Sequence, residues 1–381
     1  MSPALRIGAT GFGLIAVCYG FARFAFGLFL PQIDAELALR PSLSGLISGG
    51  SFAAYCVAII ASALLTERIG ARTVAVSAAL VAAVGMAGIA LAQTPLALAA
   101  AVIVAGSSTG LASPPMAAAV AAAVRKGRRD MTNTVINAGT SAGVALSGPI
   151  ALALAGQWRL AFGAFAVVAL GLAIIAAATL PTARGERHAG WLPPLTALIG
   201  RLICASFLMG AGSTALWSFG GQLVIDQVDW GTAGNSLLWT CIGAGGILGA
   251  WAGTLINRFG LDRVHSAFLG LMALSILTVG SGVPVAGVPL LGGAVFGAAY
   301  VMLTGVYLVW GTTALRERPA TGLMIGFATI AVGQTAGAPL FGVLLEKYGP
   351  GPTVAAFAAL TLLAALFRSR KAHRPAPQQR V

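Results

Sequence analysis

The sequence has very few charged residues. Asp, Glu, Lys and Arg make up only 9% of its 381 residues, whereas they make up about a quarter of a typical soluble domain. Hydrophobic residues account for 58%. This composition excludes an ordinary soluble globular protein, because such a chain could not cover its surface with polar groups. We therefore expect a protein that is embedded in a lipid bilayer.

Side chains that carry enzymatic or metal chemistry are also scarce. The chain has ten acidic residues, three histidines and four cysteines. The histidines are isolated and no nucleophile–base pair is recognisable, so we expect neither an enzyme nor a metal or other cofactor. Cys18, Cys56, Cys204 and Cys241 lie in apolar runs at separations that fit no metal motif. We interpret them as small buried packing residues without disulfides.

Long apolar runs, in contrast, recur along the whole chain. Each is about twenty residues or more, the length that a helix needs to cross a bilayer, apart from the last, which is shorter. We predict twelve membrane spans, although ten or eleven would also fit. The runs lie near 8–33, 43–66, 73–92, 96–124, 133–155, 160–180, 201–225, 235–256, 264–283, 287–313, 322–345 and 353–367.

The basic residues test this count. If the N-terminus is cytoplasmic, nineteen of the 23 Lys and Arg residues fall on the cytoplasmic side and three outside, and Arg23 lies within the membrane. This asymmetry follows the positive-inside rule. It predicts a multi-pass protein of the inner, cytoplasmic membrane with both termini cytoplasmic. The net charge of +13 then faces anionic lipid headgroups, and we expect no nucleic-acid partner.

The sequence repeats itself at an offset near 190. The segments 63–70 and 253–260 share one pattern, and Gly139 and Gly143 correspond to Gly333 and Gly337. Internal repeats of this kind are typical of secondary transporters, which bind substrate where the repeats meet. We predict two pseudo-symmetric six-helix halves. Their bounds are 1–180 and 201–367, with a cytoplasmic linker at 181–200 and a basic, disordered tail at 368–381.

The repeated segments resemble the signature cytoplasmic loop of the major facilitator superfamily, Gly-x-x-x-Asp-Arg-x-Gly-Arg-Lys. Ala63 takes the first glycine position in one copy and Gly253 in the other. The resemblance implies the all-helical major facilitator fold and a loop that latches the two halves together in one conformation. The residues that it assigns to this latch are Glu67, Arg68, Gly70, Arg72, Asn257, Arg258 and Gly260.

The first span is similar to the YbfB-like branch of this superfamily, through residues 20–27 and the pair Leu30-Pro31. The fifth span resembles the glycine- and proline-rich motif of antiporters, but its spacing departs by a residue. Span four lacks the Arg that many proton-linked exporters carry there. These marks imply a transporter without defining its substrate.

Arg23 is the most informative residue, because it lies near the middle of the first apolar span. A guanidinium at that depth costs about 2.5–3.5 kcal/mol by insertion scales. Such a cation either binds an anionic substrate in a water-filled cavity or bonds to neighbouring helices in a structural role. The sequence leaves both interpretations open.

The resemblance places spans one, four, seven and ten around a central cavity. Tyr19 shares a helix face with Arg23, and Tyr300, Thr304 and Tyr307 form a stripe of hydroxyl groups at i, i+4 and i+7. Buried amides in a bilayer need hydrogen-bond partners, so amides in the spans either face the cavity or join helices. The predicted substrate-binding residues are Arg23, Tyr19, Tyr300, Thr304, Tyr307, Trp217, Asn137 and Gln334.

All ten acidic residues fall in loops or at the ends of predicted spans. No carboxylate is expected beside Arg23, so coupling would come from protons carried by the substrate, from Asp34 or Asp226, or be absent. We therefore expect a secondary transporter that moves a small organic anion by alternating access, as a monomer. The alternatives are a proton-linked exporter of amphipathic drugs and, from a different class, a membrane receptor or sensor that transports nothing.

Overall fold

The computed structural model describes residues 2–182, 196–225, 231–280, 282–283, 285, 287–315 and 319–369. In these residues every regular element is a helix. The first half comprises α1 (Pro3–Ile15), the π-helical segment η1 (Ala16–Phe24), α2 (Ala25–Leu37), α3 (Pro41–Ile69), α4 (Ala71–Leu91), α5 (Pro95–Ala123), η2 (Lys126–Arg128), α6 (Arg129–Ala153) and α7 (Trp158–Thr179).

The second half repeats this arrangement with more interruptions. It comprises α8 (Ala197–Trp217), α9 (Gly220–Ile225), α10 (Gly231–Gly246), η3 (Ile247–Trp251), α11 (Ala252–Phe259), α12 (Leu261–Gly280), α13 (Gly287–Ala314), α14 (Pro319–Tyr348), α15 (Pro350–Leu363) and η4 (Ala364–Leu366).

The predicted spans are present in the predicted order. Within the described residues, eleven helices are long and apolar enough to cross a membrane, and a shorter apolar helix covers Pro350–Leu366. The first span is longer than predicted, because α1, η1 and α2 form one continuous stretch from Pro3 to Leu37. The eighth is interrupted by the 3₁₀ segment η3.

Local sequence signals explain where several helices begin. The Ser2 and Thr94 hydroxyls accept hydrogen bonds from backbone N–H groups in the first turns of α1 and α5. Such caps satisfy N–H groups that have no partner within the helix. Proline occupies the first position of α1, α3 and α5, where its missing N–H costs nothing. The cap at Thr94 and the proline that follows it explain why only three residues separate the end of α4 from the start of α5.

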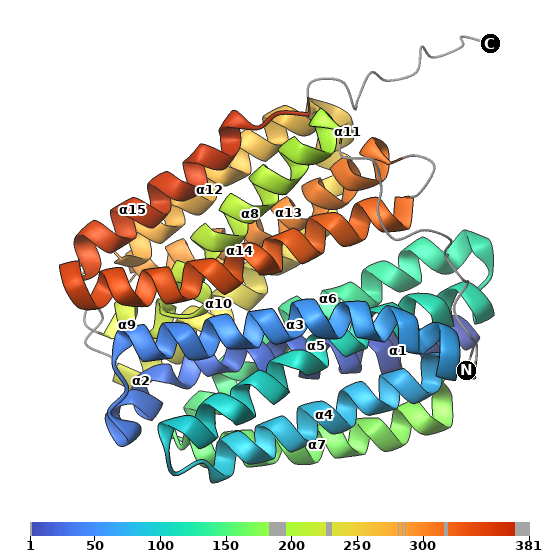
Figure 1. Ribbon diagram of the computed structural model, residues 1–381, viewed down its shortest axis with the longest axis horizontal. Coiled ribbons are helices and arrows are strands. Elements are labelled where there is room, and N and C mark those ends of the chain that lie inside the picture. Colours follow the sequence, from blue (N-terminus) through green and yellow to red (C-terminus); the bar gives the residue numbers. More distant parts are fainter. Residues whose placement is uncertain are drawn as a thin grey trace.

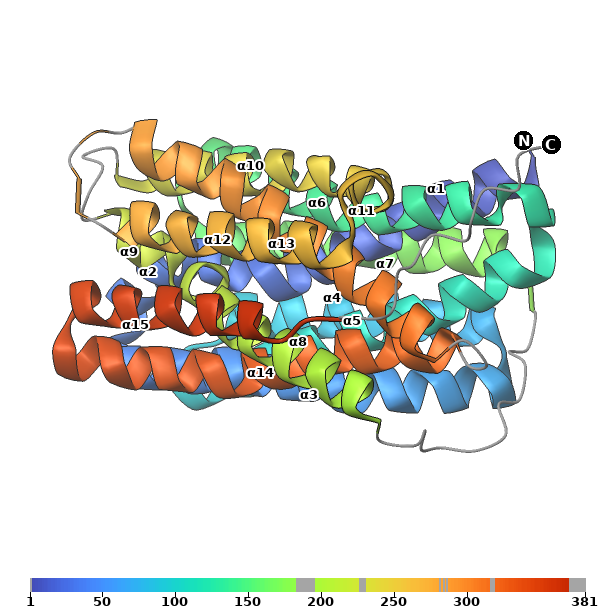
Figure 2. The same ribbon diagram turned by 90° about the horizontal axis from the view of Figure 1, so that it is seen from above.

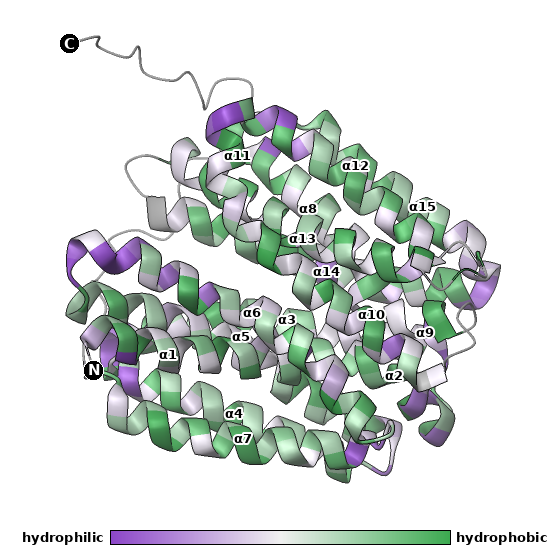
Figure 3. Ribbon diagram, turned by 180° about the vertical axis from the view of Figure 1, so that it is seen from behind, coloured by the Kyte–Doolittle hydropathy of each residue, from purple (hydrophilic) through white to green (hydrophobic). Residues whose placement is uncertain are grey.

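The helices form two bundles, one of α1–α7 and the other of α8–α15 (Figure 1). Seen from above, the helices of both bundles run along the long axis of the molecule (Figure 2). Hydrophilic residues gather at the two ends of the bundles, and the middle is apolar (Figure 3). We call the end with Arg68, Arg128 and Arg258 the basic end. The end with Pro41 and Arg159 is the opposite end.

The internal repeat is also present in the packing. In each half, two glycines four residues apart let one helix lie directly against the backbone of that half's first helix. A Cβ atom at any of the four glycines would collide with a carbonyl oxygen of the partner helix. The glycines and the residues whose carbonyls they approach are Gly139 with Phe12, Gly143 with Ala16, Gly333 with Phe207, and Gly337 with Ala211.

Glycines also line the contact between the two halves. A Cβ atom at Gly49 of α3 would lie 2.8 Å from the Thr335 carbonyl oxygen and from Cγ of Pro339, both on α14. A Cβ atom at Gly148 of α6 would likewise collide with the Ser236 carbonyl oxygen of α10. These contacts involve the parts of the helices toward the opposite end, so the halves are tightly joined there.

Candidate functional site

Arg23 lies in the last turn of the π-helical segment η1 and is only 8% exposed. π-Helical turns are rare and are often found at functional sites. The guanidinium carbon lies 4.5 Å from the Tyr55 ring centroid, 4.7 Å from Phe52, 5.2 Å from Phe24 and 5.8 Å from Tyr19. These distances allow cation–π attraction. Four rings from one half therefore hold the buried cation.

The guanidinium also bonds across to the second half. Its Nη2 donates a hydrogen bond of 2.7 Å to Oε1 of Gln334 on α14. The Gln334 amide in turn donates to the Ser213 hydroxyl of α8 and to the Tyr300 hydroxyl of α13, both at 3.2 Å. Among the described residues, no carboxylate forms an ion pair with Arg23; the ion pair found there joins Arg159 and Glu36. Arg23 is therefore balanced by neutral groups alone.

Trp217 adds a ring from the second half to the four aromatic rings around Arg23. Its ring stacks on Phe24 at 4.0 Å between centroids and meets Tyr300 edge-on at 5.1 Å. The Tyr19 hydroxyl shares a 3.1 Å hydrogen bond with Ser113 of α5. The predicted residues Arg23, Tyr19, Trp217, Tyr300 and Gln334 are thus brought together.

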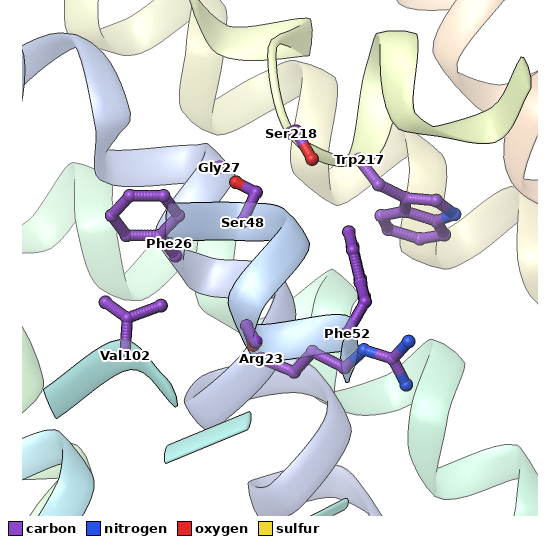
Figure 4. Close-up of a pocket in the computed structure, with 9 residues that line it drawn as sticks. Arg23, Phe26, Gly27, Ser48, Phe52, Val102, Trp217 and Ser218 are labelled. Carbon is purple, nitrogen blue, oxygen red and sulfur yellow. The ribbon is translucent and has the colours of Figure 1, made fainter. Parts of the chain in front are cut away.

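A small cavity adjoins this cluster (Figure 4). It has room for about one water molecule. Residues of both halves line it, and Figure 4 shows Trp217 and Ser218 facing Arg23 and Phe52 across it. The lining residues are Arg23, Phe26, Gly27, Ser48, Ser51, Phe52, Val102, Trp217 and Ser218.

Three predicted binding residues lie apart from this cluster. The Tyr307 hydroxyl is bonded to His265 Nε2 at 3.0 Å and donates to the Ala205 carbonyl at 3.1 Å, within the second half. Thr304 is partly exposed and donates to the Val301 carbonyl. Asn137 is exposed on α6. Tyr300 and Tyr307 share a helix face but lie about 10 Å apart along the axis, so they meet different neighbours.

The acidic residue Asp34 was expected after the first span, but it lies inside α2, which continues to Leu37. It accepts hydrogen bonds from the Ser44 hydroxyl at 3.2 Å and from the Gln222 side chain on α9 of the other half. Asp34 is three residues from the end of this span, which agrees with the expectation that acidic residues lie in loops or at span ends. Its repeat partner Asp226 lies outside the described residues.

The cysteine prediction holds in part. Cys18 is buried, whereas Cys56 and Cys241 are partly exposed and Cys204 is exposed. The expected burial of Cys204 is wrong, because it lies on an exposed face of α8. All four are free thiols.

The predicted latch loops share one backbone geometry. Gly70 has φ 89° and ψ 157°, and Gly260 has φ 86° and ψ 151°. This conformation is essentially restricted to glycine, which explains why both copies keep it. Arg72 donates to the Leu180 carbonyl at 2.6 Å, within the first half. Arg68, Asn257 and Arg258 are exposed, and Glu67 is partly exposed with interactions of its own. Whether these loops latch the halves together stays a prediction.

Sequence reasoning missed several members of the cluster. Phe24, Phe52, Ser51, Ser213 and Ser218 were not predicted as site residues. Phe52 lies three residues before Tyr55, so a shared helix face could have indicated it. The serines carried no usable signal, because serine also occurs at ordinary helix contacts in membranes.

Solved structures with the same fold support this architecture. The structure of a mutant of the nucleoside transporter NupG superposes with a TM-score of 0.83 at 13% identity, covering 96% of this chain and 98% of that one. The partially occluded inward open xylose transporter XylE from E. coli gives 0.77 at 14% identity, covering 98% and 100%. A bacterial homologue of the human lysosomal transporter Spinster gives 0.77 at 15%, covering 97% and 96%.

No curated protein sequence matches this chain. The sequence does match the Major Facilitator Superfamily over residues 12–331, which is most of its length. The chain therefore belongs to the major facilitator superfamily of membrane transporters.

Proposed function

We propose that this protein is a secondary transporter that moves a small organic anion across the cytoplasmic membrane by alternating access. One observation carries the proposal. Arg23 is a buried guanidinium whose only hydrogen bond in the described structure is to a neutral amide of the other half. A cation placed between the halves without a counter-charge offers a site at which an anion gains binding energy.

The Arg23–Gln334 contact gives this binding a route to conformational change. In this structure the Gln334 carbonyl oxygen accepts a hydrogen bond from the guanidinium that would also attract an anion. An arriving anion would compete with Gln334 and alter the bond that joins α14 to η1. A ligand shifts a conformational equilibrium only through such differential contacts.

The orientation of the protein follows from its charges. By the positive-inside rule the basic end is the cytoplasmic side, so both termini are cytoplasmic. The glycine-lined contacts then close the outer side, and transport requires them to separate. In this proposal the protein works as a monomer, and Asp34, which bonds across to Gln222, is the acidic residue placed to link protonation to that separation.

The solved relatives do not define the substrate. Their titles name nucleosides, D-xylose with protons and peptides as what those proteins carry. At 13–16% identity they show only the fold. The resemblance of the first span to the YbfB-like branch likewise implies no substrate. The organic-anion proposal therefore depends on the surroundings of Arg23.

The test compares wild-type protein with Arg23→Ala and Arg23→Lys in detergent. Thermal unfolding midpoints are measured against a panel of organic anions and lipophilic cations, because a ligand stabilises by RT ln(1 + [L]/Kd). We expect carboxylates to stabilise the wild type, Arg23→Lys to retain weaker binding, and Arg23→Ala to lose it. Stabilisation by cations in all three proteins would instead support export of amphipathic drugs.

A hit then needs a flux assay in proteoliposomes with the same variants. Uptake of the stabilising anion by wild type and not by Arg23→Ala would establish transport. Binding without any flux would favour the receptor or sensor alternative.

A further inference from the structure

Four of the residues that line the cavity beside Arg23 each carry a buried polar atom without a hydrogen-bond partner. The atoms are Nε of Arg23, Oγ of Ser51, Nε1 of Trp217 and Oγ of Ser218. The four residues are 8%, 3%, 4% and 2% exposed, respectively. Buried polar groups are nearly always paired in native proteins, so each exception requires an explanation. A cluster of four around one small space indicates a ligand.

The chemistry of these atoms restricts that ligand. Arg Nε–H and Trp Nε1–H can only donate hydrogen bonds, and the two serine hydroxyls can also donate. A group that supplies acceptor oxygens and no donors of its own can therefore accept a hydrogen bond from all four. A carboxylate does so, whereas the N–H or O–H groups of an amide or an alcohol could pair only with the serine hydroxyls and would leave Arg23 and Trp217 fewer acceptors.

The charges around the cavity restrict the ligand further. Arg23 is the one buried Lys or Arg side chain among the described residues. The other walls of the cavity are mostly apolar, with Phe26, Phe52 and Val102 among them. A single negative charge is balanced by Arg23, and a second one would be buried without a partner, which is very unfavourable.

The first half supplies most of the cavity lining, but each half supplies two of the four residues with an unpartnered polar atom. Arg23 and Ser51 belong to the first half, and Trp217 and Ser218 to the second. The space has room for about one water molecule, and so for one oxygen atom of a headgroup. A headgroup bound there would bridge the halves on the side where they are already in contact.

We propose that this cavity is the acid-headgroup subsite of the transporter, selective for monocarboxylates, with donors from both halves. The proposal rests on the proposed function, because it assigns where at Arg23 the anion is held. The carboxylate takes hydrogen bonds from Arg23 and Trp217 and from the two serines, and the organic remainder extends toward the aromatic cluster. The hydrogen-bond donors disfavour neutral analogues. The single positive charge of Arg23 disfavours dicarboxylates.

The test uses variants that each remove one hydrogen-bond donor while largely preserving the shape of the side chain. Trp217→Phe keeps the ring that stacks on Phe24 but lacks the N–H group, and Ser51→Ala and Ser218→Ala remove the hydroxyls. The matched control is Trp310→Phe, because Trp310 is also fully buried with an unpartnered Nε1 but does not line the cavity. Folding of every variant is checked by its unfolding midpoint without ligand.

The probes are formate, acetate, benzoate, benzamide, phthalate and chloride, titrated by thermal shift. We expect the monocarboxylates to bind the wild type and Trp310→Phe equally and to bind Trp217→Phe about tenfold more weakly or worse. The serine variants should weaken binding as well, and benzamide and phthalate should not bind. Equal affinity in Trp217→Phe and wild type, or no binding of any monocarboxylate, would overturn the subsite.

Two further outcomes separate this subsite from the wider function. If chloride binds as well as formate and competes with it, the cavity holds a free inorganic anion and not the substrate headgroup, which overturns the proposal. If Arg23→Ala abolishes benzoate binding while Trp217→Phe and the serine variants leave it intact, the anion binds Arg23 elsewhere. The proposed function then survives and the subsite fails.

Discussion

The glycine-lined contact between the halves allows one conformational prediction to be worked out in detail. In Gly49→Ala, the new Cβ would lie 2.8 Å from the Thr335 carbonyl oxygen and 2.8–2.9 Å from Cγ and Cδ of Pro339. Ordinary van der Waals contact begins near 3.4 Å. Neither a carbonyl nor a proline ring can rotate away, so α3 and α14 must separate by several tenths of an ångström.

The energetic consequence depends on the conformation. Overpacking of this kind costs about 1–3 kcal/mol, but only while α3 and α14 touch at this end. A conformation in which the halves have separated there avoids the cost. A bias of about 1–3 kcal/mol corresponds to a shift of roughly 5- to 150-fold in the equilibrium, so Gly49→Ala should populate the conformation that is open at the opposite end.

The assay measures how readily a reagent reaches the cavity from the opposite end, where α3 and α14 touch. A cysteine replaces Ser218, which is 2% exposed and lines the cavity, in a background without the four native cysteines. The rate of its reaction with a membrane-impermeant maleimide is measured from the outer side. We expect Gly49→Ala to raise this rate by at least about fivefold, the lower end of that shift.

The control is the neighbouring variant Gly50→Ala. A Cβ at Gly50 would lie 3.1 Å from the Ile103 side chain of α5, within the first half. It therefore costs stability in both conformations and should leave the labelling rate unchanged. If Gly49→Ala folds normally and labels at the wild-type rate, or if Gly50→Ala raises the rate equally, the reasoning about the contact between the halves is refuted.

Three other predictions concern single contacts. Gln334→Glu places a carboxylate beside Arg23 and should weaken carboxylate binding by about tenfold or more, because the buried charge is already neutralised; unchanged affinity in thermal-shift titrations would contradict this. Gly70→Ala should lower stability by about 1–3 kcal/mol, since φ is 89° there, and a midpoint equal to wild type would show that the loop can rearrange. Arg159→Ala breaks an ion pair of 2.7 Å with Glu36 whose side chains are 33% and 47% exposed. It should cost at most about 1 kcal/mol and less in high salt, and a larger, salt-independent loss would contradict a surface role.

Much of the architecture could be predicted from the sequence because it depends on local patterns. Apolar runs long enough for a bilayer define the spans, and the two glycine pairs at an offset of 194 predicted a repeat that reappears in the packing of α6 and α14. The turns at Gly70 and Gly260 could also be predicted from the sequence, since each needs a backbone conformation that glycine adopts. Arg23 was recognisable because a charge within an apolar span is rare.

The partners of Arg23 were decided only by the tertiary structure. Its hydrogen bond to Gln334 joins residues 311 positions apart. Helical periodicity tells which side chains share a face, but not which distant helix that face meets. Tyr300 and Tyr307 lie on one stripe, yet one bonds to Gln334 and the other to His265. The cavity with its unpartnered donors exists only where the two halves pack together, so no stretch of sequence from one half alone could have indicated it.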